Sequence, residues 1–414
     1  MNSRERVLAA INHQEPDRVP IDLGGTRQSG IAASTYHLLK QHLNITTPTK
    51  VFDLYQMLAE VEESVLDRLG VDVVGIHRSA VAFGIRNENW KPWQLFDGTE
   101  VRVPSCFNPV TEPNGDLLLL DADGKPLASM PEGGFYFDRL DKYPGAAHVD
   151  PESLDLPLLS PQECEHLNAQ AEAYQQNSDR AIVCAMGPPY ELFFGLGNGD
   201  FSAWMLTLAT EPEYVHALYE RLVEAWLENL RRLYQALGDR IQILQFNDDL
   251  GMQNAPFLSV AMFRELIMPY YRQGLAWIHQ NTPWKVFMHN DGAIFDLIPS
   301  LIEMGVDILN PVQTTATGMD PILLKQQFGD QLVFWGAACD CQDTLSFGSP
   351  DEVSREVKES IRVLAPGGGY VLAGVHNIQA KVPPENVMAL FDTALSAGRY
   401  QEPVHHSRQS PLNT

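Results

Sequence analysis

From Ala181 onward, short apolar runs alternate with longer segments in which apolar positions repeat with the period of a helix. The apolar runs are AIVCAM, IQILQF, KVFMH, VDILN, LVFWG and YVLAG. Each run precedes a helix-length amphipathic segment, for example PILLKQQF after VDILN. Almost continuously apolar strands are typical of a parallel sheet covered on both faces, and alternating strand and helix signals predict βα units.

The first part of the chain adds two further strands, near Ile21 and at residues 71–76, which brings the predicted count to eight. Helices are predicted at residues 3–12, 34–43 and 56–69. Asn2 or Ser3 is suited to cap the first of these helices. Eight βα units favour an α/β fold of the (β/α)8 TIM barrel type, with an open doubly wound sheet as the alternative.

Between residues 87 and 140 the pattern changes to short strands separated by turn residues, as in PNGDLLLLDADGKPLASMP. Asn-Gly and Asp-Gly pairs favour tight turns, so this stretch predicts a small antiparallel β insertion. We therefore expect four parts in the chain. They are residues 1–86 (first part of the barrel), 87–140 (the insertion), 141–398 (remainder of the barrel) and 399–414 (a disordered tail).

The composition narrows the class of protein. The chain has 414 residues, 53 acidic and 29 basic, with a formal net charge of -24, which disfavours binding to nucleic acid or to an anionic membrane. No stretch approaches the roughly 18 apolar residues of a membrane span, and the N-terminus lacks the pattern of a signal peptide. The five cysteines contain no CxxC pair, so a disulfide framework is not expected. We predict a soluble, cytoplasmic protein.

Polar side chains follow several predicted strands at the point where each strand ends. In a parallel barrel these positions meet at one rim, the face where such enzymes keep their chemistry. Any one of these residues could equally have a structural role, but five such positions together predict a ligand-binding rim. The strand-end residues are Asn247-Asp248-Asp249, His289-Asn290-Asp291, Asn310, Cys339-Asp340 and His376-Asn377.

The segment FMHNDG carries two candidate metal ligands. His289 and Asp291 are two residues apart and point to the same side if the strand continues that far, and His376 can supply a third arm. Imidazole and carboxylate suit Zn2+, and three protein ligands leave a position open for a substrate atom. A site without metal, in which these side chains only hydrogen-bond a substrate, is the alternative.

The same segments resemble the uroporphyrinogen decarboxylase superfamily, and especially its corrinoid-dependent branch, which includes methylcobamide:coenzyme M methyltransferases. This resemblance implies a (β/α)8 barrel. It covers most of the chain outside the insertion and the tail. The matching segments are SRERVLAAINHQEPDRVP, FNDDLGMQ, FMHNDGAIFDLIPSLIEMGVDILNPVQ, FWGAACD and GGGYVLAGVHNIQAKVPPENVMALFDTA.

Two departures from the family patterns bear on the branch. Decarboxylases carry Arg-Gln-Ala-Gly-Arg and a catalytic aspartate in Phe-Ser-Asp, whereas this chain has Arg27-Gln28-Ser29-Gly30-Ile31 and Ile76-His77-Arg78-Ser79. The methyltransferases bind zinc through His-x-Cys-Gly and a distant cysteine, and here Asp291 and His376 stand at the cysteine positions. The resemblance therefore argues against decarboxylation of uroporphyrinogen and permits zinc with harder ligands.

The resemblance implies a methyltransferase that moves a methyl group, as in O-demethylation, between a small methylated substrate and a corrinoid (cobalamin). No corrinoid-binding domain is recognisable in the chain, so a carrier protein would be the partner. A lyase or decarboxylase of a small carboxylate and a non-catalytic sensor are the alternatives, and the oligomeric state, including a homodimer, stays open. The expected roles are catalytic for Asp248, Asp249, Glu191 and Asp340, substrate-binding for Asn247, Gln253, Asn310 and Asn377, and metal-binding for His289, Asp291 and His376.

Overall fold

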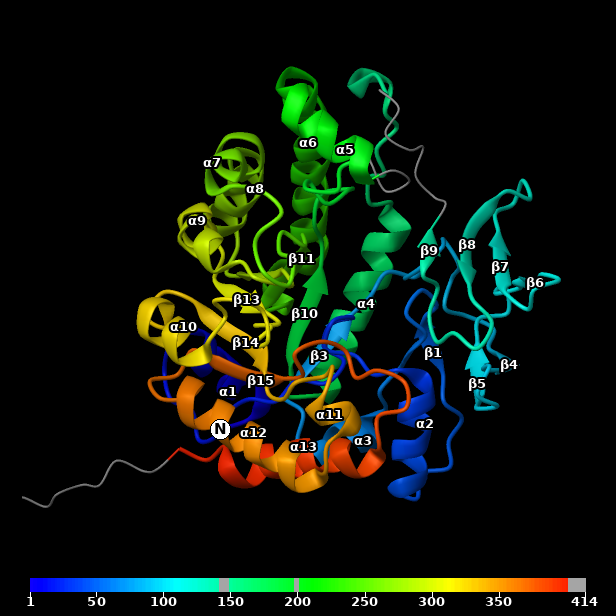
Figure 1. Cartoon of the computed structure of the whole chain (residues 1–414), viewed down its shortest axis with the longest axis vertical. Helices are drawn as coiled ribbons and strands as arrows, with labels where there is room; N and C mark the ends of the chain where they lie inside the picture. The colour runs from blue at the N-terminus through cyan, green and yellow to red at the C-terminus, as the bar shows by residue number, and fades with distance from the viewer. Residues whose placement is uncertain (141–148, 197–200, 401–414) are drawn as a thin grey trace, which may run out of the picture.

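The structure is a computed structural model that describes residues 1–140, 149–196 and 201–400 (Figure 1). The disordered tail predicted at residues 399–414 lies almost entirely outside the described residues. Seven strands form one parallel sheet in the order β15-β14-β13-β12-β11-β10-β3. Their bounds are β3 Val73–Ile76, β10 Ala181–Ala185, β11 Ile243–Asn247, β12 Lys285–His289, β13 Ile308–Asn310, β14 Val333–Ala337 and β15 Tyr370–Ala373.

The segment around Ile21 closes this sheet into a barrel. Ile21 forms a parallel bridge with Leu372 of β15, and its carbonyl accepts a 2.8 Å hydrogen bond from the backbone N–H of Asp72, next to β3. The buried Asp72 carboxylate accepts the Ile21 N–H at 2.9 Å and pairs with Arg6 and Arg18. The eighth position is thus a short bridge, and the (β/α)8 prediction is confirmed.

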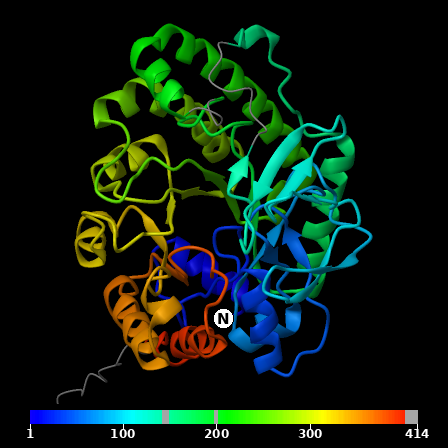
Figure 2. The same cartoon turned by 45° about the vertical axis from the view of Figure 1, so that its right-hand side comes forward.

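Helices surround the barrel in Figures 1 and 2. They are α1 Ser3–Ile11, α2 Ala33–His42, α3 Glu63–Leu69, α4 Pro161–Asn177, α5 Phe201–Thr210, α6 Pro212–Leu237, α7 Val260–Met262, α8 Met268–Asn281, α9 Ile298–Met304, α10 Pro321–Phe328, α11 Thr344–Phe347, α12 Pro350–Leu364 and α13 Pro384–Ala397, with short 3-10 turns at η1 Pro151–Ser153, η2 Gly238–Arg240 and η4 Phe295–Leu297 and a π-helical turn at η3 Phe263–Ile267. No helix in the described ranges is both long and apolar enough to cross a membrane.

Helix α1 contributes to the interior core of the barrel. Asn2 caps this helix through a capping box with Glu5, as the sequence predicts. Val7, Ala10 and Ile11 of α1 belong to a compact cluster that also takes buried residues from all seven strands. The cluster fills the interior of the barrel with apolar side chains, and polar side chains such as His289 and Asn310 stand at the ends of the strands.

The helix predicted at residues 56–69 is wrong in its first half. Residues 51–59 form an antiparallel hairpin, β1 Val51–Asp53 and β2 Leu58–Ala59, and the helix begins only at Glu63. The Asp53 carboxylate accepts the backbone N–H groups of Tyr55 at 2.8 Å and Gln56 at 3.1 Å, which turns the chain. This side-chain hydrogen bonding overrides the helical spacing of the apolar residues.

The insertion is antiparallel, as predicted, and lies beside the barrel at the right of Figure 1. Its strands form a two-stranded sheet, β4-β5, and a four-stranded sheet, β6-β7-β8-β9. Gly98, Gly115 and Gly124 take positive φ angles at its turns. The strand bounds are β4 Lys91–Gln94, β5 Glu100–Val103, β6 Val110–Thr111, β7 Leu117–Leu120, β8 Pro126–Met130 and β9 Arg139–Leu140.

Candidate functional site

A cavity of about 620 Å³ lies at the carboxyl ends of the strands, and we call it the rim pocket. Its volume is in the ordinary range for a small-molecule site. One side comes from the ends of β11, β12 and β15 and from the loop after β10. The other side includes the loop after the Ile21 bridge and the turn after β1. Its polar lining includes Arg27, Gln28, Tyr55, Gln56, Asp138, Tyr190, Glu191, Asn247, Asp249, His289 and His376.

His289, Asp291 and His376 meet at the rim pocket, with one potential ligand atom each and all three atoms within 4.8 Å of one another. Asp291 Oδ2 lies 3.4 Å from His289 Nε2 and 3.8 Å from His376 Nε2. His289 is the last residue of β12 and stands in register with Asn247 and Asn310 on the neighbouring strands. Residues that the sequence places far apart are therefore brought together by strand pairing.

Gly292 allows the chain to turn directly after this cluster. Its φ is +87°, and a Cβ there would lie 2.4 Å from the backbone of Gly251. Only glycine fits so close to another backbone at this φ angle. The final glycine of FMHNDG therefore keeps Asp291 at the pocket while the chain leaves the strand.

Two asparagines fix the orientation of the two imidazole rings. Asn310 Nδ2 donates to the Trp335 carbonyl at 2.9 Å. The Oδ1 of Asn310 therefore faces His289 and accepts a hydrogen bond of 2.6 Å from His289 Nδ1. Asn377 Nδ2 donates to Gln56 Oε1 at 2.9 Å, and its Oδ1 accepts from His376 Nδ1 at 3.0 Å. Both rings are thereby held with the proton on Nδ1 and with Nε2 toward Asp291, as metal-binding histidines require.

The charges in the cluster balance one another. Burial lowers the pKa of His289, but the carboxylates of Asp291 and Asp249 outweigh it and raise this pKa to about 9. Burial and the neighbouring His289 lower the pKa of His376. Burial raises the pKa of Asp291, but the two imidazoles outweigh it and hold this pKa below its usual value. The donor set fits a divalent cation, which would replace the proton on His289 Nε2 and leave the proton on Nδ1 in place.

Of the two predicted catalytic aspartates in FNDDLG, only Asp249 faces the rim pocket. Its Oδ1 accepts the Asp291 N–H at 3.1 Å and lies 3.8 Å from His289 Nε2. Burial raises the pKa of Asp249. Asp248 is fully buried, and its Oδ2 accepts from the Phe193 N–H at 2.9 Å and the Tyr271 hydroxyl at 2.7 Å. Asp248 therefore anchors a loop behind the pocket.

The predicted site residues separate into three groups by position. Asn310 and Asn377, both 1% exposed, lie behind the histidines. Gln253 donates from Nε2 to the Thr315 carbonyl at 2.7 Å on an outer loop, and Asp340 Oδ1 accepts the Gln342 N–H at 2.8 Å in a turn, so neither lines the pocket. The residues that the structure brings together are Glu191, Asn247, Asp249, His289, Asp291 and His376.

Sequence reasoning missed the opposite side of the pocket. Arg27 forms an ion pair with the buried Asp53 and lies with its guanidinium 5.7 Å from the Tyr55 ring centre. Gln28 accepts from Gln245 Nε2 at 2.9 Å. Arg27 and Gln28 belong to the motif Arg-Gln-x-Gly, which matches the decarboxylase pattern in part. This partial match could have identified both residues as part of the site. Tyr55 immediately precedes the helix predicted at residues 56–69, and it belongs to no motif and follows no predicted strand.

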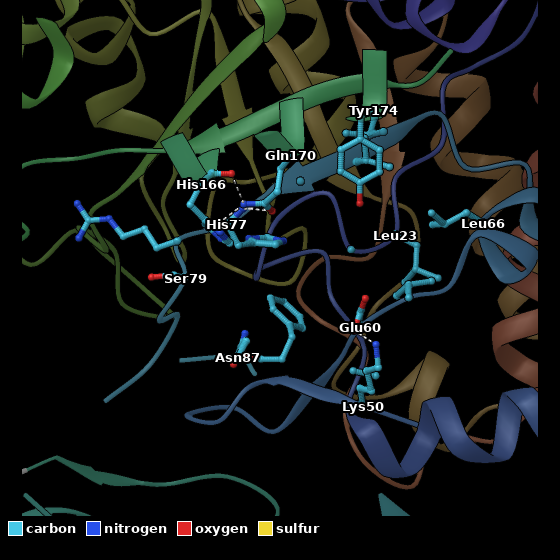
Figure 3. A pocket seen from close by; sticks show the side chains of 18 of the residues that line it. Leu23, Lys50, Glu60, Leu66, His77, Ser79, Asn87, His166, Gln170 and Tyr174 are labelled. Carbon is cyan, nitrogen blue, oxygen red and sulfur yellow. Dashed lines mark hydrogen bonds and ion pairs between the residues drawn. The ribbon is translucent and has the colours of Figure 1, made fainter. Parts of the chain in front are cut away.

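A neighbouring cavity of about 370 Å³ lies between β3, β1 and α4 (Figure 3). His77 lies in its wall, with its ring 4.8 Å from that of Phe52, and Gln170 donates from Nε2 to the His77 carbonyl at 2.8 Å. Burial lowers the pKa of His77 to about 4, so this imidazole is neutral at pH 7. His77 thus differs from the charged cluster at the rim pocket.

The comparisons with known proteins agree with this architecture. The family described as "Uroporphyrinogen decarboxylase (URO-D)" matches residues 157–396. The uroporphyrinogen decarboxylase of Neisseria meningitidis is 24% identical over 210 residues, which is 50% of this chain and 54% of that protein, so the match spans about half its length. That of Anaeromyxobacter dehalogenans is 21% identical over 402 residues, covering 95% and 99% of the two chains.

A solved structure, a methyltransferase from Methanosarcina mazei, superposes with a TM-score of 0.59 at 17% identity and covers 96% of this chain and 99% of its own. At this identity the likeness establishes the fold alone. The family match is more specific, because it extends over β10 to β15 and hence over every strand that carries a member of the His-Asp-His cluster or leads to one. This chain therefore belongs to the uroporphyrinogen decarboxylase family.

Proposed function

We propose that the protein is a methyltransferase that moves a methyl group between a small methylated substrate and the corrinoid of a separate carrier protein. The observation that carries the proposal is the convergence of His289, Asp291 and His376 with both Nε2 atoms turned toward one carboxylate. Such a set is suited to hold Zn2+ and to leave a position open toward the pocket. The shared fold with the Methanosarcina mazei methyltransferase is compatible with this reaction.

Zinc bound by this cluster would polarise the heteroatom that carries the methyl group, which makes that heteroatom a better leaving group. The reduced corrinoid of the carrier would supply the nucleophile, and its electron pair, for the new bond to methyl, while the electron pair of the broken bond would stay on the heteroatom. Asp249 faces the same space and has a raised pKa, so its protonated form can supply the proton that the heteroatom needs.

The other side of the rim pocket is suited to select the substrate. Arg27 is the single arginine or lysine among the described residues that line the pocket, and Asp53 and Tyr55 hold it in place. A guanidinium there can pair with one anionic group of a small substrate. The octa-anion uroporphyrinogen would need several such cations, whereas this pocket also contains Asp138, Glu191 and Asp249.

A second candidate is a lyase that decarboxylates a small carboxylate. Arg27 favours it, because the same guanidinium could bind the carboxylate that is lost, and Asp249 could protonate the carbanion that remains. The two candidates differ in their need for a corrinoid. They also differ in product, since only the lyase releases carbon dioxide.

The test loads the purified protein with Zn2+ and offers free methylcobalamin or cob(I)alamin with a panel of methoxylated, methylamino and thiol compounds. We expect the corrinoid absorbance to interconvert between the two forms. Asp291→Asn should lower turnover at least about 100-fold, because the charge at the heteroatom develops only as the methyl leaves. Asp340→Asn is the matched control outside the pocket and should change turnover less than about twofold.

The same assays decide against the proposal if no compound in the panel gives corrinoid turnover while a small carboxylate releases carbon dioxide. That result would establish the lyase. Uroporphyrinogen serves as a separate check. We expect no coproporphyrinogen from it, and formation of that product would show that porphyrin decarboxylation has been retained.

A further inference from the structure

A separate apolar cavity of about 340 Å³ lies between the β insertion and the N-terminus of α2, and we call it the insertion cavity. Its wall includes Met57, Trp93, Leu95, Phe107 and Leu117. None of its described lining residues carries a charged side chain. The volume and the apolar wall are those of a small-molecule site, and the missing charges favour a neutral occupant.

One polar group in this wall lacks a partner. Ser34 lines the insertion cavity and is 3% exposed, and among the described residues its hydroxyl has no hydrogen-bond partner. Ser34 is the second residue of α2, and the N-cap residue Ala32 makes no side-chain hydrogen bond to the helix. A buried hydroxyl without a partner is unfavourable, and the N-terminus of a helix attracts an oxygen atom that accepts hydrogen bonds.

The aromatic residues favour a ring over an alkyl chain. Trp93 and Phe107 meet edge to face with ring centres 5.3 Å apart, and Phe107 meets Phe137 at 6.0 Å and 87°. Phe137 continues this contact to Phe83 at 5.3 Å. An additional planar ring in the cavity can extend the same edge-to-face packing, which is favourable beyond the area that it buries.

We propose that the insertion cavity is a binding site for a small neutral aromatic alcohol of the phenol class. The ring would pack against Trp93 and Phe107, and the phenol oxygen would accept a hydrogen bond from the Ser34 hydroxyl. This site goes beyond the methyl transfer proposed above and does not depend on it.

The insertion cavity and the rim pocket are lined by neighbouring residues of the same two segments. Tyr55 and Gln56 line the rim pocket, whereas the next residue, Met57, lines the insertion cavity. On the insertion side, Phe135 lines the insertion cavity and Asp138 the rim pocket. The two sites are thus neighbours with different chemistry, and the experiment must tell binding at one from binding at the other.

The experiment measures binding of phenol and of toluene to the full-length protein by isothermal titration calorimetry. We expect saturable binding with one phenol per chain. Ser34→Ala should weaken phenol binding about three- to tenfold, the range for one hydrogen bond, and leave toluene binding unchanged. Leu117→Trp should fill the cavity and weaken both ligands at least about tenfold.

Leu120→Trp is the matched control, since Leu120 lies on the same strand β7 but is 37% exposed and outside the cavity wall. It should bind phenol like the unaltered protein. Thr111→Trp, at an exposed edge of the cavity, replaces Leu117→Trp if the latter does not fold. The proposal is overturned if neither ligand binds the unaltered protein, if the cavity-filling variant binds phenol normally, or if Ser34→Ala weakens phenol and toluene equally.

Discussion

The two sides of the rim pocket are built by different means. On one side, His289 ends the paired strand β12, and Asp291 and His376 lie in the loops that follow β12 and β15. On the other side, Arg27 and Tyr55 lie on loops outside the barrel sheet. We call the first the strand side and the second the loop side. Metal chemistry needs closely held ligands, and here His289 lies on a strand while Asp291 and His376 follow strand ends by only two and three residues. The loops that carry Arg27 and Tyr55 have no such anchor in the barrel sheet and tolerate change more readily.

The supporting contacts follow the same division. On the strand side, each imidazole is held by an asparagine whose own amide is fixed by another partner, Trp335 for Asn310 and Gln56 for Asn377. On the loop side, Arg27 is held by an ion pair with Asp53, a ring contact with Tyr55 and a long hydrogen bond of 3.5 Å from its Nη2 to the Val81 carbonyl. We infer that substitutions on the strand side change metal binding and that substitutions on the loop side change substrate binding.

The largest expected effect is loss of the metal. His289→Ala and His376→Ala should each lower the affinity for Zn2+ at least about 1,000-fold, because two remaining ligands compete poorly with water. Zinc content of protein purified without chelator, measured by elemental analysis, checks this. Arg27→Gln, on the loop side, is the control and should retain one zinc per chain. Metal-free protein in the unaltered form would refute the zinc site.

The fold could be predicted from sequence because a strand that is buried on both faces of a sheet has a continuous run of apolar residues. KVFMH predicts β12 residue for residue, and IQILQF covers all of β11 except its last residue, Asn247. Prediction from the spacing of apolar residues fails where a side chain hydrogen-bonds the backbone and turns it. Asp53 turns the chain at Tyr55 and Gln56, so a helical spacing of apolar residues becomes a hairpin.

The site was only partly predictable for a related reason. Polar residues that follow predicted strands indicate the strand side of the pocket. Six of the predicted site residues do meet at the rim pocket. What a residue does once there depends on partners that are remote in sequence. The sequence predicts Asn310 as a substrate-binding residue. In the structure its amide N–H donates to the Trp335 carbonyl and its amide oxygen accepts from His289. Asp340 follows a strand too, yet caps a local turn.

The next effect is a pH dependence of zinc affinity that arises on the strand side alone. The pKa of His289 is about 9 in the metal-free protein, so below pH 9 zinc must displace a proton from this residue. Apparent affinity should therefore rise about tenfold per pH unit well below pH 9, by about 50-fold from pH 7 to pH 9, and then level off. Calorimetry at pH 7 in buffers of different ionisation enthalpy should show one proton released per zinc.

The same raised pKa has a consequence for stability. A histidine whose pKa is higher in the folded state stabilises the fold below its unfolded pKa of about 6.5, and this contribution is lost as the pH rises through about 9. Metal-free protein should accordingly lose stability over that interval, whereas His289→Gln should not show this loss. A flat zinc affinity between pH 7 and pH 9 would contradict the ion pair of His289 with Asp291.

A smaller effect is expected from the residues that hold the ligands. Asn310→Leu keeps the volume but removes the acceptor for His289 Nδ1, so the ring can turn or change its protonated nitrogen. Zinc affinity should fall about 10- to 100-fold, the usual cost of losing such a partner. Asn310→Asp restores an acceptor and should recover most of the affinity. Equal loss in both variants, measured by competition with a zinc chelator, would indicate a packing defect instead.

The smallest effect belongs to the loop side, where Arg27→Gln should raise the KM of a carboxylate-bearing substrate about tenfold, leave that of a neutral counterpart unchanged and hardly alter kcat. The variant also leaves the buried Asp53 carboxylate without its cation, at a cost of about 2 kcal/mol of stability. Asp53→Asn in the Arg27→Gln background removes the orphaned charge and should recover that stability but not the KM. A double-mutant cycle on both quantities separates the two roles of Arg27: if stability and KM recover together, Arg27 acts only through the shape of the loop, and the loop side does not select the substrate by charge.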